Sequence, residues 1–343
     1  MRKKTKKTIG KIIIIFLVFV LFAGYIAYKQ AFSVISGIEK PVYVYIDNKK
    51  NYADLLACLQ SDAKIKNIRV FERLAAVMKY PANMKSGRYE IKPGMSYPEL
   101  IRMLRNGNQA PVKLTFNNIR LKKDFAERVG EQMLFESGQL LSALNNPEIC
   151  ERFGFDTITV VSMFIPNTYE IYWTLSVANF LQRMKKEYDR FWTNQRLEKA
   201  QAIPLTPAEV SVLASIVEEE TAEKSEYPVV AGLYINRLRK GMLLQADPTV
   251  KFAIGDVTLK RILYVHLAVN SPYNTYKNPG LPPGPIRIPS ISGIDAVLNY
   301  AEHNYLYMVA KEDFSGKHNF STNLSEHNRN ARKYQDALNR NHY

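Results

Sequence analysis

The stretch Thr206–Ala222, TPAEVSVLASIVEEETA, predicts a helix that ends in three consecutive glutamates. Thr206 can cap the helix with its hydroxyl, Pro207 occupies the first turn, and Glu209 stands at the third position, which together are typical of a helix start. At 100° per residue, five apolar side chains gather on one face of this helix. They are Val210, Leu213, Ala214, Ile216 and Val217. We therefore expect this face to pack against a core.

The same helical wheel separates the three glutamates. Glu220 lies about 50° from the centre of the apolar face, Glu218 about 110° and Glu219 about 150°. We expect Glu219 in water, Glu218 at the margin, and Glu220 directed toward the core or a cleft. Burial raises the pKa of a carboxyl, so Glu220 could hold a proton near neutral pH and act as a general acid on a glycosidic bond. The alternative is an exposed acidic helix end.

The amino terminus has the layout of a membrane anchor. Six basic residues precede the uninterrupted apolar run 12–28, and Lys29 closes its far side. A cleaved signal peptide has a similar layout, but no small-x-small cleavage site follows, and the apolar run exceeds a typical signal core. We predict a basic cytoplasmic tail (1–11), a transmembrane signal anchor (12–28), and all later residues on the outer side of that membrane.

Net charge gives little support for nucleic-acid binding. Residues 1–29 hold seven of the 47 basic residues and no acid, so the other residues carry 40 basic against 32 acidic side chains. These charges are dispersed, and no zinc-finger spacing, RNA-binding aromatic signature or Arg-rich arm is present. A modest basic excess outside the membrane suits an anionic polymer or a membrane surface.

Cysteine and histidine usage argues against a metal site or a cofactor. Cys58 and Cys150 are 92 residues apart, and the five histidines show no HExxH or i,i+4 pairing. We therefore predict neither metal nor cofactor. The two cysteines could pair in an oxidising compartment, but two separate core residues are the simpler expectation.

Composition predicts an α+β protein with three folded parts after the anchor. Residues 40–110 read as a small mixed unit, with strands near 42–47 and 86–91 and capped helices between and after them. Residues 111–205 look mainly helical, with an aromatic-proline turn at 164–169. Residues 206–343 hold the glutamate helix and three polar, aromatic or proline-rich loops, at 245–250, 270–276 and 280–286. Such stiff loops suit carbohydrate, although ordinary surface turns use the same residues.

Several long motifs in order make the chain similar to the YceG-like family, the endolytic murein transglycosylases. They are SGRYEIKPGMSYPELIRMLRNG (86–107), FIPNTY (164–169), LASIVEEET (213–221), INRLRKGMLLQADPTV (235–250), SPYNTYKNPGLPPGPIRIPS (271–290) and HNFSTNLSEHN (318–328). The family's catalytic glutamate precedes the threonine of this third motif, a position that Glu220 occupies here. Asn167 departs from the family's usual Asp. The family's small domain resembles a LysM unit and corresponds to residues 40–110.

The resemblance implies cleavage of the MurNAc–GlcNAc β-1,4 bond within peptidoglycan strands without water, leaving 1,6-anhydro-MurNAc ends. Glu220 would serve as acid and then as base. Candidate substrate contacts are Gln245, Asp247, Asn270, Tyr273 and Asn274, and structural hydrogen bonding within the loops is the alternative for each.

The resemblance also implies a partner and a place in the cell. It implies work beside peptidoglycan synthases, at the cytoplasmic (inner) membrane with the catalytic part on the outer side, and termination of nascent strands. Two other functions stay open at this point. One is a non-catalytic peptidoglycan-binding scaffold, and the other is a muramidase-type hydrolase in which Asp247 or Glu218 supplies a second carboxylate.

Overall fold

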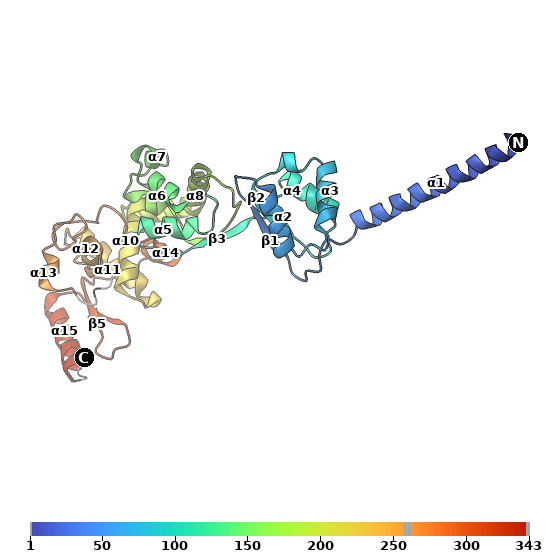
Figure 1. Cartoon of the computed structure of the whole chain (residues 1–343). Coiled ribbons are helices and arrows are strands. Elements are labelled where there is room, and N and C mark those ends of the chain that lie inside the picture. Colours follow the sequence, from blue (N-terminus) through green and yellow to red (C-terminus); the bar gives the residue numbers. More distant parts are fainter. Residues whose placement is uncertain (1, 257–258, 260–261, 341–343) are drawn as a thin grey trace. The chain divides into compact units, whose positions relative to one another are not determined.

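The computed structural model describes residues 2–256, 259 and 262–340, which form two compact units (Figure 1). Unit 1 holds the chain up to Lys113 together with Glu170–Leu175. Unit 2 holds Leu114–Tyr169 and the chain from Ser176 onward. The chain is therefore a mixed α+β protein in which the smaller unit receives one short segment from the middle of the sequence.

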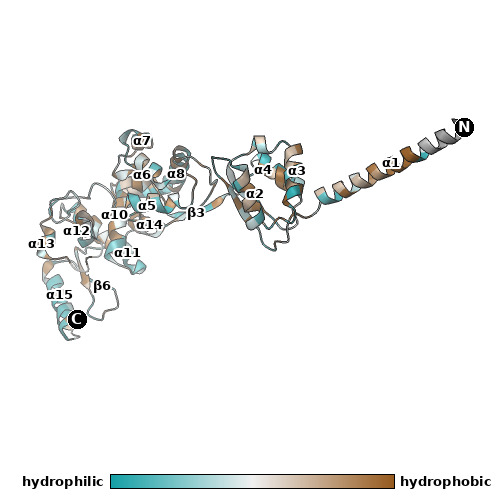
Figure 2. Cartoon of the chain, in the orientation of Figure 1, coloured by the Kyte–Doolittle hydropathy of each residue, from teal (hydrophilic) through white to brown (hydrophobic). Residues whose placement is uncertain are grey.

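The first element, α1 (Arg2–Ala31), contains a stretch long and apolar enough to cross a membrane. This stretch covers Gly10–Ala31, with a mean hydropathy of 2.5, and none of it is buried within the protein. Figure 2 shows it as the brown part of α1. An exposed apolar helix of 22 residues fits the predicted single-pass anchor.

The rest of unit 1 is a two-stranded sheet with helices packed on one face. The order is β1 (Val42–Ile46), α2 (Tyr52–Ser61), α3 (Ile68–Val77), the 3₁₀ turn η1 (Pro81–Asn83), β2 (Gly87–Ile91) and α4 (Tyr97–Asn106). β1 and β2 are antiparallel, with Val42 opposite Ile91 and Ile46 opposite Gly87. Inward side chains of both strands, such as Val44 and Tyr89, form one core with Leu59, Phe71 and Leu100.

Local signals in the sequence set the ends of α4. The Ser96 and Glu99 side chains form a reciprocal capping box at its start. Its last turn ends at Gly107, whose φ of 76° lies in the left-handed region that glycine adopts without strain. The capped helix predicted after the strand near 86–91 is thus confirmed.

Unit 2 is mainly helical and contains the strand pair β5–β6 and most of the pair β3–β4, of which residues 112–113 and 170–171 belong to unit 1. In chain order, its first half consists of β3 (Val112–Phe116), α5 (Lys122–Gly130), α6 (Ser137–Leu144), α7 (Pro147–Glu151), η2 (Thr159–Met163), β4 (Asn167–Ile171), α8 (Val177–Phe191) and α9 (Asn194–Ala202). Its second half consists of α10 (Pro207–Glu220), η3 (Lys224–Glu226), α11 (Tyr227–Arg239), α12 (Asp247–Ile254), α13 (Tyr264–Leu267), α14 (Ile291–Leu298), β5 (Tyr307–Ala310), β6 (His318–Ser321) and α15 (Leu324–Arg340).

The sequence prediction for 164–169 was partly wrong. We expected a turn over this whole segment, but its second half, Asn167 to Tyr169, is the beginning of β4. The strand forms because Tyr169 and Ile171 alternate inward into the core while their neighbours stay exposed.

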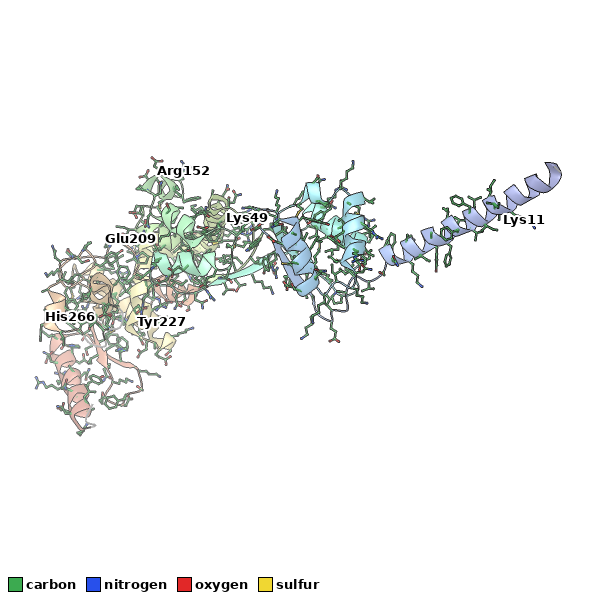
Figure 3. All side chains as sticks on the ribbon, viewed as in Figure 1. Lys11, Lys49, Arg152, Glu209, Tyr227 and His266 are labelled. Carbon is green, nitrogen blue, oxygen red and sulfur yellow. The ribbon has the colours of Figure 1, made fainter. Side chains whose placement is uncertain are left out.

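The helix α10 lies at the centre of unit 2. All nine residues from Val210 to Glu218 are buried, so the single apolar face expected from the wheel is too narrow a description. The helix contacts η2, α9, α11, α12 and α14, which together cover it on several sides. Figure 3 labels Glu209 near its start and Tyr227 at the start of α11, so both helices can be followed there.

Residues 111–205 and 206–343 do not form separate domains in this structure. Trp192, Ala200 and Ile203 belong to the same hydrophobic core as Val210 and Leu213 of α10. Because that core is shared, most of the predicted connecting region is a structural part of the unit that carries Glu220.

Candidate active site

Glu220 is the last residue of α10 and is partly exposed to a cavity. The hydroxyl of Tyr234, a residue of α11 that is 2% exposed, donates a hydrogen bond of 2.6 Å to Glu220 Oε1. Among the described residues this is the one hydrogen bond that Glu220 accepts, so Oε2 is available to a substrate. One oxygen is therefore fixed by the protein framework and the other is left for chemistry.

The surroundings raise the pKa of Glu220 to about 7. Burial is the largest cause, because a carboxylate loses its hydration there. The Tyr234 hydrogen bond lowers the pKa, the Asp247 carboxylate raises it, and the cations of Arg237 and Lys251 lower it. A carboxyl with this pKa exists in both forms at neutral pH, which a group that first donates and then accepts a proton requires.

Arg237, one turn after Tyr234 on α11, holds the walls of the cavity together. Its guanidinium donates to the carbonyls of Leu306 at 2.6 Å, Leu244 at 2.7 Å and Leu243 at 3.2 Å. Carbonyl oxygens carry only partial charge, so the cation keeps its full field near Glu220. Arg237 thus joins α11, the loop before α12 and the start of the C-terminal hairpin.

The cavity in front of Glu220 has a volume of about 350 Å³ and is mostly polar. Its walls come from α10, α11, the loop and start of α12, and the C-terminal elements β5, β6 and α15. The side chains are Glu220, Leu233, Tyr234, Arg237, Leu244, Gln245, Asp247, Tyr276, Tyr307, Met308, Val309, Ala310, His318, Leu324 and His327. This size and polarity suit one or two sugar residues of a longer chain.

Two of the predicted substrate contacts, Gln245 and Asp247, line this cavity with Glu220. Gln245 has a φ of 51°, in the left-handed region that non-glycine residues rarely adopt, and its backbone N–H donates to the Thr275 carbonyl. Asp247 Oδ1 accepts a 2.6 Å hydrogen bond from the Tyr276 hydroxyl. The two side chains are exposed, so they can reach a bound polymer.

The structure does not bring the other three predicted contacts, Asn270, Tyr273 and Asn274, to the walls of this cavity. Asn274 is fully buried, and its amide donates to the carbonyls of Leu267 and Val269, so it holds the loop in shape. The ring of Tyr273 packs against Phe252, with centroids 4.7 Å apart. Asn270 is exposed on the same loop.

The wheel placed Glu218 and Glu219 wrongly. Glu218 is 8% exposed and its carboxylate accepts hydrogen bonds from the N–H and hydroxyl of Ser290, which fixes α10 to the start of α14. Glu219, expected in water, pairs with Arg120 and Arg287, and its side chain is 14% exposed. These partners are 68 to 99 residues away in sequence, where helical periodicity gives no information. Neither carboxyl lines the cavity of Glu220.

Thr221, the residue after Glu220, is also hydrogen-bonded to a carboxyl group, that of Glu226. Glu226, 8% exposed, accepts hydrogen bonds from the hydroxyl of Thr221, at 3.1 Å, and from the backbone N–H of His318, at 2.8 Å. The ring nitrogen Nδ1 of His318 lies 2.8 Å from Glu226 Oε2, the same oxygen that accepts the hydrogen bond from Thr221. Glu226 thereby connects the end of α10 to β6, the strand that forms one wall of the cavity.

Sequence reasoning missed the contributions of Tyr234, Arg237, Tyr276 and His327. The first two stand three residues apart on a helix that is otherwise apolar on that side, and this i,i+3 spacing places polar groups on one face. The contribution of His327 is harder to predict, because this residue lies on α15, 107 residues after Glu220 in the sequence. Burial and the nearby Arg237 lower the pKa of His327, so its imidazole stays neutral.

The described residues contain no cluster of three or more His, Cys, Asp or Glu side chains that could hold a metal ion. The free cysteines Cys58 and Cys150 lie in units 1 and 2 respectively, and the thiol of Cys150 is buried.

Comparison with protein-family models gives a match over residues 44–333 to the YceG-like family. The chain belongs to this family. The match covers both units and every motif quoted from the sequence, so the predicted family membership is confirmed.

Similar proteins with names are the endolytic murein transglycosylases of Bacillus subtilis and Streptococcus pneumoniae. The chain is 26% identical to the first over 333 residues, covering 91% of each chain. It is 25% identical to the second over 94% of its own length, and it spans 64% of that longer protein. Among solved structures, the crystal structure of a protein described as YceG-like from Listeria monocytogenes aligns with a TM-score of 0.55 at 27% identity. That alignment covers 85% of this chain and 99% of the Listeria chain.

Proposed function

We propose that this protein is a membrane-anchored endolytic murein transglycosylase, a lyase that acts on peptidoglycan. The observation that carries the proposal is Glu220, a partly buried carboxyl with a pKa of about 7 that faces a polar cavity of about 350 Å³. The family and the names of its relatives supply the substrate class. The residues supply a group with the proton affinity that this reaction needs.

The proposed reaction uses Glu220 twice. The protonated carboxyl donates its proton to the oxygen that links C1 of MurNAc to GlcNAc, and that C–O bond breaks through an oxocarbenium-like state. The resulting carboxylate then takes the proton of the MurNAc 6-hydroxyl, whose oxygen bonds to C1 and closes the 1,6-anhydro ring. No water is consumed, and Glu220 ends in its original protonated form.

The neighbours of Glu220 have supporting roles in this scheme. Burial and the adjacent Glu220 carboxyl raise the pKa of Tyr234 well above its ordinary value, so its hydroxyl remains a donor throughout. It can steady the carboxylate that forms after the first step. The Arg237 cation adds a favourable field for the same charged form. We propose Gln245 and Asp247 as contacts to the sugar hydroxyls, with Asn270 on the neighbouring loop as a more distant candidate.

The packing and hydrogen bonds of the two remaining predicted substrate contacts, Tyr273 and Asn274, favour a structural role for both. Tyr273 and Asn274 use their side chains to shape the 264–276 loop, and we infer that they act on substrate through that loop.

The place of action follows from the anchor and the substrate. We propose that α1 crosses the cytoplasmic (inner) membrane once, with the basic residues 2–7 in the cytoplasm and both units on the outer side, where peptidoglycan lies. Cleavage within strands at that surface would end the growth of nascent glycan chains beside the synthases that make them. Residues 40–110, which include β1, α2, α3, β2 and α4, are our candidate for the LysM-like module.

The decisive experiment incubates the full-length chain in detergent with purified peptidoglycan and determines the masses of the released fragments. Fragments lighter by one water than hydrolysis products, ending in 1,6-anhydro-MurNAc, are expected. The matched variant Glu220→Gln keeps the shape of the side chain but has no acid to give, and we expect it to release none.

Two other outcomes would each replace the proposal. Reducing ends would mean a hydrolase, and they would make Asp247, the other carboxylate at the cavity, the base that holds the water. Unchanged polymer in the presence of a folded, polymer-binding wild type would favour a scaffold. Glu218 is no longer a candidate for the second carboxylate, because Ser290 occupies it away from the cavity.

A further inference from the structure

Unit 1 exposes aromatic rings on the outer face of its sheet. Val44 and Ile46 of β1 point into the core, whereas Tyr43 and Tyr45 alternate with them and are 38% and 48% exposed. Large rings are costly to leave in water, and two on one strand face are unusual without a ligand or partner. The exposed side of the β1–β2 sheet therefore needs an explanation beyond folding.

These rings are held in fixed positions by β2. The Arg88 guanidinium lies 3.5 Å from the ring centroid of Tyr43, and its Nε donates to the hydroxyl of Tyr45 at 3.2 Å. The hydroxyl of Tyr43 donates to Glu90 at 3.3 Å, its partner across the strand pair. A surface whose side chains are already ordered loses little entropy when it binds, which is a property of recognition sites.

A third ring comes from the segment Glu170–Leu175, which belongs to the same unit. Trp173 meets Tyr45 edge-on, with centroids 5.0 Å apart and an interplanar angle of 76°. The hydroxyl of Thr174 donates to the Gln109 side chain at 3.1 Å and fixes this segment. We call Tyr43, Tyr45, Arg88, Glu90 and Trp173 the aromatic face.

The unit that carries the aromatic face is also the basic part of the protein outside the anchor. Outside the anchor, the residues of this unit, 32–113 and 170–175, contain 14 Lys and Arg against 8 Asp and Glu, a net charge of +6 out of the +8 carried by residues 30–343. The remaining residues, which include Glu220, are nearly neutral. The partner of unit 1 should therefore combine flat apolar surfaces, hydrogen-bonding groups and negative charge.

We propose that the aromatic face binds a stretch of glycan strand outside the cavity of Glu220. The proposal rests on the proposed function for the identity of the polymer. Sugar rings present C–H faces that stack on Tyr and Trp, and hydroxyls that hydrogen-bond to Arg88 and Glu90. The carboxylates of the attached peptides would meet the surrounding lysines and arginines.

A membrane surface is the alternative ligand of the aromatic face, but the side chains of this face argue against it. Glu90 lies on this face with 27% of its side chain exposed, and an anionic lipid surface would repel it. The tyrosine hydroxyls are also tied to Arg88 and Glu90, whereas rings that insert among lipid head groups need to be free to tilt. A sugar ring with polar edges satisfies both features, because the negative charge of the polymer lies on the attached peptides and not on the ring that contacts this face.

Binding at the aromatic face would change how the enzyme meets its polymer. A strand held there stays attached to the same molecule that carries Glu220, so the second encounter becomes intramolecular. Long strands would benefit and short fragments would not. The face would thus favour long glycan chains as substrates.

The test measures Kd for soluble, uncrosslinked peptidoglycan strands with the full-length chain carrying Glu220→Gln, which leaves the polymer uncut. In this background, Tyr45→Ala combined with Trp173→Ala should weaken binding about tenfold, a loss of about 1.4 kcal/mol. Val77→Ala, at a more exposed apolar position at the end of α3 that lies outside the aromatic face, is the control and should leave Kd unchanged. Tyr45→Phe, which keeps the ring, should retain most of the affinity.

Three further readouts separate the explanations. In the wild-type background, Tyr45→Ala with Trp173→Ala should raise KM for long strands while kcat on short soluble fragments stays the same. Binding to phosphatidylglycerol vesicles should be equal for all variants.

An unchanged Kd in the double variant, or a loss of vesicle binding with intact glycan binding, would overturn the proposal. If the double variant loses its thermal transition, Trp173→Leu alone decides by the same Kd. The catalytic role of Glu220 is tested separately, by whether cleavage leaves 1,6-anhydro-MurNAc ends, and its failure would not affect this Kd measurement.

Discussion

Two cavities border the same pair of helices, and they differ in almost every respect. The cavity of Glu220 measures about 350 Å³ and is lined mainly by polar groups from the carboxyl end of α10 and from α11. The other measures about 510 Å³ and is lined mainly by apolar side chains, among them Ala208 and Val212 of α10 and Leu281 of the proline-rich loop.

The larger of these two cavities is therefore not the one that Glu220, with its pKa of about 7, faces. Glu209 also borders the apolar cavity, but its carboxylate is bonded to the N–H and hydroxyl of Thr206 in the capping box. Glu220, at the opposite end of the same helix, keeps one oxygen available and has a pKa near 7. One helix thus carries one glutamate that is bonded in its capping box and another that faces a polar cavity, the one that we propose as the acid.

The largest effect in a test of this contrast should come from Tyr234→Phe, which removes the hydrogen bond to Glu220 and keeps the ring. We expect kcat to fall about tenfold or more, because a hydrogen bond to a charged group is worth about 1.5–3 kcal/mol. That bond lowers the pKa of Glu220, so its loss should also move the alkaline limb of the pH–rate profile to higher pH. A normal kcat with an unchanged pH profile would contradict the role given to Tyr234.

A second test separates the framework of α10 from its chemistry. Glu219→Gln removes the carboxylate that pairs with Arg120 and leaves Arg287 with its longer 3.9 Å contact to Glu218, so we expect a loss of about 2 kcal/mol of stability, or about 4–8 °C in Tm. The wheel alone would predict an almost silent change. Below the transition temperature, kcat should stay within about threefold of wild type. A fall in kcat as large as that of Glu220→Gln would mean that Glu219 takes part in the reaction.

The pH dependence of activity gives a third test, at Lys251. Its cation lowers the pKa of Glu220, so Lys251→Met should raise that pKa and shift the alkaline limb to higher pH. The acid form is the one that starts the reaction and it is lost as pH rises through about 7, so the variant should keep activity further into the alkaline range. Lys251→Arg keeps the charge and serves as the control. A shift to lower pH would show that the sign of this interaction is wrong.

We expect the smallest effect on activity from a change at the larger, mainly apolar cavity. Ala208→Gln places a polar side chain at the wall of the larger cavity, far along α10 from Glu220. Activity on long strands should stay within about twofold, since surface changes away from special features cost little. A strong loss of kcat/KM with normal thermal stability would mean that the apolar cavity also receives substrate.

Short-range sequence signals predicted much of this fold. Thr206 with Glu209 and Ser96 with Glu99 set the starts of α10 and α4, and alternation of Val and Tyr set β1. These features depend on neighbours within four residues, so they are readable without a structure. The same holds for the apolar run of α1.

Long-range contacts explain what the sequence did not reveal. Helical periodicity cannot show that Arg120 and Arg287 come to Glu219, or that Ser290 comes to Glu218. It also cannot show that His318 and His327, from the last elements of the chain, complete the cavity of Glu220. The polar loop 270–276 was expected at the site because its composition suits sugars, but Asn274 uses its amide to hold backbone carbonyls.

The division of the chain has a consequence for how such an enzyme can evolve. Unit 1 is interrupted, because Glu170–Leu175 returns to it from the middle of unit 2 and brings Trp173 to Tyr45. A gene fragment that ended at Lys113 would leave this segment behind, and one that began at Leu114 would carry it away from its partners. The two units therefore cannot be exchanged between proteins by a single recombination event, and they should be inherited together as one piece.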